Sequence, residues 1–211
     1  MLLCASVSVC LAQEPPSAPA SAPAPATTKA ANPWSYNASV AGYLVPQGQS
    51  YAQPTFMMDG TWAHLEARYN SEFLQTASLW FGYDFNFGKK LQLAFTPMIG
   101  GVFGKQNGIA PGTELTLTYR RLKLYNSSEY IFDTGNHNNS YFYMWTEVSY
   151  FPIKWFRFGG VAQRTRVYHT GLDVQRGFLL GASYKKASFT TYVFNAGWTQ
   201  PTWNLTLSYS F

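Results

Sequence analysis

Three side chains in the first half of the chain could do acid–base chemistry. His64, Glu66 and Arg68 stand two residues apart, so on an extended strand they project from one face. Acyl hydrolysis needs a nucleophile, a base within hydrogen-bonding reach and a site for the oxyanion. The sequence holds no G-x-S-x-G segment, and His137 and His169 lie in polar stretches without metal-ligand spacing. We therefore expect no enzyme, no metal and no cofactor; lipid hydrolysis through His64 is the least favoured alternative.

The composition indicates which elements hold these residues. The chain has 211 residues, of which 46% are hydrophobic, 18% aromatic and 12% charged, whereas a typical soluble domain is about 25% charged. No apolar run approaches the roughly 18 residues of a membrane-spanning helix. A transmembrane β-barrel fits this composition, because its lipid-facing residues alternate with polar ones that face the lumen. The 16 Phe, 15 Tyr and 7 Trp residues exclude intrinsic disorder.

Alternating apolar and polar residues, bounded by turn residues, predict an all-β, up-and-down antiparallel barrel of twelve strands, with ten or fourteen as alternatives. Asp59-Gly60 is a strong hairpin signal and separates the second strand from the third. The count is then even, as in bacterial single-chain barrels. The predicted strands are 34–45, 51–58, 61–70, 73–87, 91–103, 113–119, 122–133, 141–150, 155–168, 174–184, 187–196 and 203–211.

The last of these strands alternates over nine residues. One face holds Trp203, Leu205, Leu207, Tyr209 and Phe211, and the other holds only Asn, Thr and Ser. This strand, with its terminal Phe, resembles that of bacterial outer-membrane β-barrel proteins, in which it is the signal read by the barrel-assembly machinery. The resemblance implies an integral outer-membrane protein whose partners are that machinery and outer-membrane lipids, including lipopolysaccharide.

The N-terminal segments differ from the predicted barrel of residues 34–211. Residues 1–13 form a short apolar stretch that predicts a signal peptide. Because no Lys or Arg precedes this stretch, a start inside a longer signal is the alternative. Residues 14–33 are rich in Pro, Ala, Ser and Thr and predict a disordered periplasmic linker. Both cysteines lie in the signal segment, so the barrel needs no disulfide.

Connection lengths predict the orientation. Short turns at 59–60, 88–90, 120–121, 151–154 and 185–186 are expected in the periplasm, and longer loops at 46–50, 105–112, 134–140, 169–173 and 197–202 outside. The connection at 70–72 is a short exception, and no loop is expected to plug the lumen. The short turns carry a basic rim, which either binds an anionic partner or only keeps the turns hydrated: Lys89, Lys90, Arg120, Arg121, Lys154, Lys185 and Lys186.

Alternation also predicts the lumen. The candidate pore-lining residues are His64, Glu66, Arg68, Asp84, Glu114, Lys123, Glu129, Glu147 and Arg157. Either they line a narrow aqueous passage, or they pair and fill a closed barrel. We favour a small porin-like channel for passive diffusion of small hydrophilic solutes, because twelve strands lie between filled and open barrels. The alternative is a closed barrel that anchors through its loops or basic rim. No basic, aromatic-interleaved patch indicates nucleic-acid binding.

Overall fold

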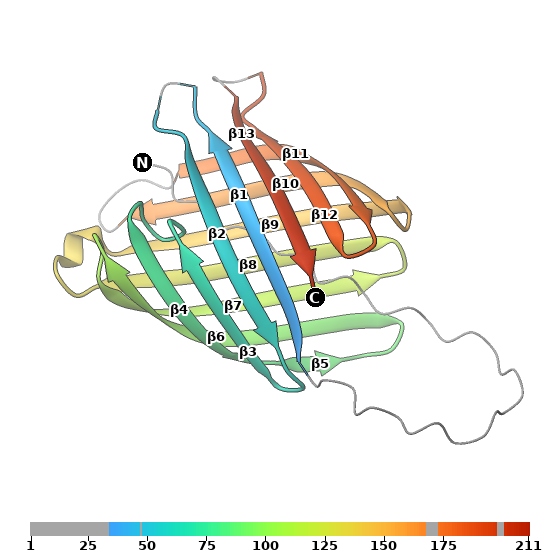
Figure 1. The fold of residues 1–211 in the computed structure, drawn as a ribbon, viewed down its shortest axis with the longest axis horizontal. Helices are drawn as coiled ribbons and strands as arrows, with labels where there is room; N and C mark the ends of the chain where they lie inside the picture. The colour runs from blue at the N-terminus through green and yellow to red at the C-terminus, as the bar shows by residue number, and fades with distance from the viewer. Residues whose placement is uncertain (1–33, 47, 168–172, 198–200) are drawn as a thin grey trace, which may run out of the picture.

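The computed structural model describes residues 34–46, 48–167, 173–197 and 201–211, which form one antiparallel sheet closed on itself. Each strand pairs with its neighbours in sequence, except that β4 and β5 both pair with β6, and β13 pairs with β1 to close the barrel. In Figure 1 the strands β13, β1 and β2 run steeply across β7, β8 and β9 behind them, as tilted strands of a barrel do. The elements are β1 (Ser35–Leu44), β2 (Tyr51–Asp59), β3 (Ala63–Tyr69), β4 (Thr76–Tyr83), β5 (Phe85–Phe87), β6 (Leu91–Gly104), β7 (Gly108–Tyr119), β8 (Leu122–Asp133), the 3-10 helix η1 (His137–Asn139), β9 (Tyr141–Ile153), β10 (Phe156–Val167), β11 (Asp173–Tyr184), β12 (Ala187–Phe194) and β13 (Thr202–Ser210).

β4 and β5 are two parts of one crossing. Both pair with β6, first from Thr76 to Gly82 and then from Phe85 to Phe87. Asp84 interrupts them, and its Oδ1 accepts a hydrogen bond from Thr96 Oγ1 at 2.6 Å. The described chain therefore crosses the barrel twelve times, and the predicted closed barrel of twelve strands is confirmed.

Strict alternation explains why these residues form strands. In β4, every second side chain is buried in the barrel and every other one is exposed on its outer wall. Thr76, Ser78 and Trp80 face inward, whereas Leu79 and Phe81 face outward. The large apolar residues of the other strands are exposed in the same way, and the buried set is rich in Ser, Thr, Gln and charged residues. The barrel is thus apolar outside and largely polar inside.

Most predicted strand limits agree with the structure to within one residue, and those of β8 agree at both ends. The loop predicted over 105–112 is wrong, because β7 begins at Gly108. The strand includes Pro111, which has no N–H to donate to the ladder. Pro111 still pairs with Ile99 of β6, while the register with β8 is interrupted between Ile109 and Gly112.

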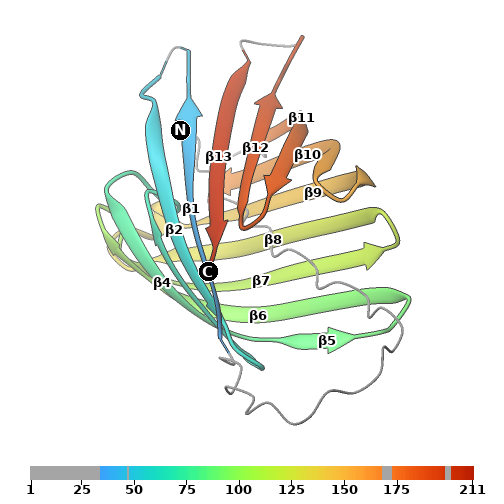
Figure 2. The ribbon, with the colours of Figure 1, turned by 45° about the vertical axis from the view of Figure 1, so that its right-hand side comes forward.

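The two ends of the barrel have connections of different length. At one end, here named the turn end, the strands join over 60–62, 88–90, 120–121, 154–155 and 185–186. At the other, the loop end, the connections described in full run over 70–75, 105–107 and 134–140. Figure 2 shows the connections after β5, β7 and β9 together at the turn end. The chain enters β1 and leaves β13 at the turn end, where Phe211 N donates to Tyr36 O.

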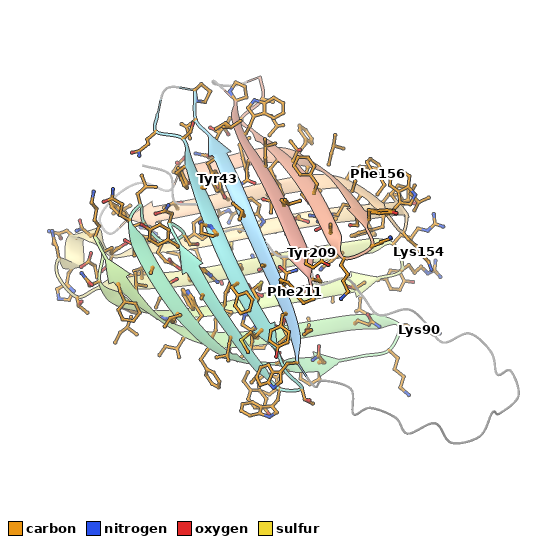
Figure 3. The ribbon with its side chains drawn as sticks, viewed as in Figure 1. Tyr43, Lys90, Lys154, Phe156, Tyr209 and Phe211 are labelled. Carbon is orange, nitrogen blue, oxygen red and sulfur yellow. The ribbon has the colours of Figure 1, made fainter. Side chains whose placement is uncertain are left out.

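The turn end carries all seven residues of the basic rim, and all seven are exposed. Figure 3 shows two of them, Lys90 and Lys154, directed away from the barrel. Among the described residues, no helix is long and apolar enough to cross a membrane. The predicted signal segment and linker, residues 1–33, lie outside the described residues, as does His169.

Candidate functional site

The structure places the nine candidate pore-lining residues on the inner side of the barrel. Three of them, Asp84, Glu114 and Lys123, are half-buried. Six are buried, each at most 5% exposed: His64, Glu66, Arg68, Glu129, Glu147 and Arg157. Alternation along each strand sets this placement, because successive side chains of a strand point to opposite faces of the sheet. The structure brings most of these side chains into two clusters.

The first, which we name the central cluster, consists of Glu66, Arg68, Glu72, Trp80 and Glu129. The Arg68 guanidinium donates to Glu66 Oε2 at 2.6 Å and to Glu129 Oε2 at 2.8 Å. Its Nη1 also lies 3.5 Å from Glu72 Oε1, and its Cζ stands 4.6 Å from the centre of the Trp80 ring. Because β3 and β8 are not neighbours in the sheet, the Arg68–Glu129 ion pair spans the lumen.

Glu72 was not predicted, and it changes the description of the lumen. It belongs to the loop 70–75, which runs into the barrel and buries Ser71 and Glu72 completely or nearly so. Glu72 Oε1 accepts from Ser78 Oγ at 2.7 Å and Trp80 Nε1 at 3.1 Å. The Glu72 carbonyl accepts from Tyr141 Oη of β9 at 2.7 Å, so the loop is attached to a distant part of the wall.

The expectation that no loop would enter the lumen is therefore wrong. The sequence suggested a connection over 70–72 because Phe73 fits the apolar pattern of the next strand. In the structure the connection extends to Gln75, and Phe73 packs on the inner aromatic cluster instead. The one indication in the sequence is that the acidic Glu72 directly precedes the apolar Phe73. Phe73 also fits the alternation of the next strand, so the periodicity assigned it to that strand.

The second cluster, which we name the lower cluster, surrounds Arg157. Its Nη1 donates to Glu147 and to Ser149 Oγ, and its Nη2 donates to Thr190 Oγ1 at 3.0 Å. Tyr192 Oη and Ser149 Oγ both donate to the Glu147 carboxylate, at 3.0 and 2.7 Å. The Arg157 guanidinium and the Glu147 carboxylate thus neutralise each other's charge, and nearby hydroxyl groups make further hydrogen bonds with both.

Aromatic side chains line the wall between these clusters. Trp145 packs edge-on against Tyr192 and Phe194, with ring centres 5.2 and 5.5 Å apart. Its Nε1 is buried and has no hydrogen-bond partner. Tyr125 donates from Oη to Glu114 Oε1 at 2.6 Å. These inward aromatics form a continuous buried cluster with Trp80, Tyr141 and Tyr143.

His64 lies near the turn end of the lumen. Its Nδ1 is 2.6 Å from Asp59 Oδ1, and its Nε2 is 3.8 Å from Glu66 Oε2. Both neighbours are carboxylates, so the contacts of His64 include no hydroxyl nucleophile of the kind that hydrolysis needs. His137 is exposed in η1. In the described part of the chain, no group of three His, Cys, Asp or Glu side chains could hold a metal ion.

The side chains of the two clusters are almost fully shielded from water. In the central cluster, Arg68 of β3 pairs with Glu129 of β8 and with Glu72 of the loop 70–75, and each of the three is at most 5% exposed. The loop 70–75 and the Arg68 side chain therefore occupy part of the lumen at this level.

The comparisons with known proteins agree with this geometry at the level of fold. No family model matches the chain, and no curated protein matches it. Among solved structures, the KdgM porin is similar, with a TM-score of 0.59 and 11% identity over 83% of this chain and 99% of that one. The KdgM porin in complex with disordered oligogalacturonate gives 0.58 and 12% over 84% and 99%. At this identity the likeness shows the fold alone: the chain shares the closed antiparallel β-barrel of these porins.

Proposed function

We propose that the protein is a small porin-like channel for passive diffusion of hydrophilic solutes, and that the loop 70–75 controls its width. The observation that carries this proposal is a closed twelve-stranded barrel whose inner wall is polar and charged along much of its length. A barrel with a purely structural interior needs no charges there, because burying an ion has a high desolvation cost.

The level of the central cluster favours a passage that opens by local movement. One loop of six residues and one arginine side chain span the lumen there. Loop-end connections are the elements that most readily change position without loss of the sheet. The similarity to solved porins adds to the same proposal.

A closed, anchoring barrel is the second candidate. The low exposure of both clusters favours it, since paired Glu and Arg residues can serve as a polar core. In that case the loops or the basic rim at the turn end would contact the partner. An enzyme is the least supported candidate, because His64 contacts only carboxylates.

We further propose that the barrel lies in a bacterial outer membrane with the turn end in the periplasm. Short periplasmic turns and longer outer loops are the rule for such barrels. Outer-membrane lipids, including lipopolysaccharide, would then cover the apolar wall. The barrel-assembly machinery would read the last strand, whose outward residues include Leu207 and Tyr209.

Single-channel recording of the full chain in planar bilayers tests the proposed function. Discrete conductance steps are expected. Folding is checked on the same sample by heat-modifiable migration in gels, which reports a closed barrel. A folded barrel that never conducts, in any loop variant, would rule out the channel and leave the anchoring barrel.

A further inference from the structure

Acidic and basic residues are sorted between the inside and the outside of this barrel. Among the described residues, eight of the nine acidic side chains lie buried or half-buried in the barrel: Asp59, Glu66, Glu72, Asp84, Glu114, Glu129, Asp133 and Glu147. Of the fourteen Lys and Arg residues of the same part, three do so: Arg68, Lys123 and Arg157. The formal charge of the lumen is therefore strongly negative, although the whole chain has a net charge of +5.

The remaining basic residues lie where they act weakly on the lumen. Arg164, Arg166 and Arg176 are exposed and alternate with the buried Gln163 and Gln175, so they face the outer wall. Lys105 is exposed in the connection 105–107. The seven residues of the basic rim are exposed on turns. Salt screens exposed charges over about 8 to 10 Å at physiological ionic strength, whereas buried charges are screened far less.

The central cluster holds more carboxylates than its arginine requires. Three of them, from Glu66, Glu72 and Glu129, surround one guanidinium. Glu72 is 0% exposed, and its Oε2 has no hydrogen-bond partner, so an acceptor oxygen remains unused inside the cluster. The Trp80 face beside Arg68 also favours positive charge. The lower cluster, by contrast, is balanced, with one carboxylate for one guanidinium.

We propose that this lumen selects positively charged solutes, and that the surplus carboxylates of the central cluster are the charges that select them. This inference rests on the proposed channel function and names its substrate class. A cation that reaches the cluster meets acceptor oxygens and an indole face, as the Arg68 guanidinium already does. An anion meets uncompensated carboxylates at the level of the central cluster, where repulsion is strong because these groups are buried away from water.

The sign of the reversal potential tests the proposal. The full chain is recorded in a planar bilayer under a gradient of potassium chloride, and a potassium-to-chloride permeability ratio above one is expected. Glu72→Gln and Glu129→Gln keep side-chain shape and remove charge, so each should lower that ratio. Asp173→Asn is the matched control, because Asp173 is the exposed ninth acid at the loop end; it should leave the ratio within error.

The outcomes separate this inference from the channel itself. A conducting barrel that prefers chloride would overturn the cation selectivity and keep the channel. Absence of conductance in a folded barrel would overturn the channel first. Equal effects of Asp173→Asn and Glu72→Gln would show that the mouth, and not the central cluster, selects the ion. Where a variant fails to fold, the sign obtained for the unmodified chain still decides.

Discussion

The two buried arginines of the lumen have different roles because their surroundings differ. Arg157 meets one carboxylate, from Glu147, and the hydroxyl groups of Ser149, Thr190 and Tyr192. A buried ion of this kind is tolerated when its partners are complete, and removing one partner leaves the other buried and unpaired. The lower cluster should therefore contribute to stability rather than to selectivity.

Arg157→Gln should lower the free energy of unfolding by about 3 kcal/mol, because Glu147 is then buried without its counter-ion. The double variant Glu147→Gln/Arg157→Gln should recover part of this loss, since no charge remains. Urea unfolding in detergent micelles, followed by tryptophan fluorescence, measures both. Lys186→Gln, at an exposed turn position, is the control and should change stability by less than about 0.5 kcal/mol. A double variant that is less stable than Arg157→Gln alone would contradict this coupling.

At the scale of the element, the loop 70–75 determines how the lumen is used. Its two ends, Asn70 and Gln75, have positive φ angles of 60° and 59°. The Asn70 side chain accepts from Gln75 N at 2.7 Å and donates to Ala52 O at 2.9 Å. Asparagine tolerates this left-handed backbone better than most residues. Asn70 thus holds the loop in the shape that directs Glu72 inward.

Asn70→Ala should weaken this loop and raise the open-channel conductance, because both side-chain hydrogen bonds are lost and alanine is strained at positive φ by roughly 1–2 kcal/mol. Bilayer recording of the variant beside the unmodified chain measures the change. Asn195→Ala is a matched control, since Asn195 has a φ of 58° and begins the connection between β12 and β13. The same rise in both variants would assign the effect to general loosening of the barrel.

The strands could be predicted from the sequence, whereas the loop 70–75 could not. Periodicity of two located the twelve crossings, because each strand must hide one face from lipid, and β8 was predicted to the residue. It did not locate the loop 70–75, whose path depends on Tyr141, a residue 69 positions from Glu72. Alternation placed Glu66, Arg68 and Glu129 inside, but it carries no information about partners across the lumen. The surplus of carboxylates around Arg68 needed the three-dimensional arrangement.

At the scale of the whole molecule, the barrel reverses the polarity of a soluble protein. Leu180 of β11 is 58% exposed, and Phe178 and Tyr184 on the same face are also exposed. In a soluble protein, replacing such exposed residues by lysine would change stability little. In a bilayer the same positions face hydrocarbon or headgroups according to their distance from the turn end. The exposed fraction of a side chain therefore does not predict how much stability a lysine costs at that position. Its position along the strand, between the turn end and the bilayer midplane, does.

Leu180→Lys and Tyr184→Lys make this difference measurable on one strand. Leu180 lies within β11 and Tyr184 is its last residue, beside the turn 185–186. Lysine at the bilayer midplane costs about 2–4 kcal/mol and near the interface about 0–1 kcal/mol, so Leu180→Lys should be clearly destabilising and Tyr184→Lys nearly neutral.

Chemical unfolding of the full chain in liposomes gives the free energy of unfolding of both variants. Repeating the measurement in mixed micelles should reduce the difference between the two variants, because detergent thins the apolar belt. Equal costs at the two positions in liposomes would contradict a membrane-spanning β11, since only hydrocarbon distinguishes two exposed side chains on the same face of one strand.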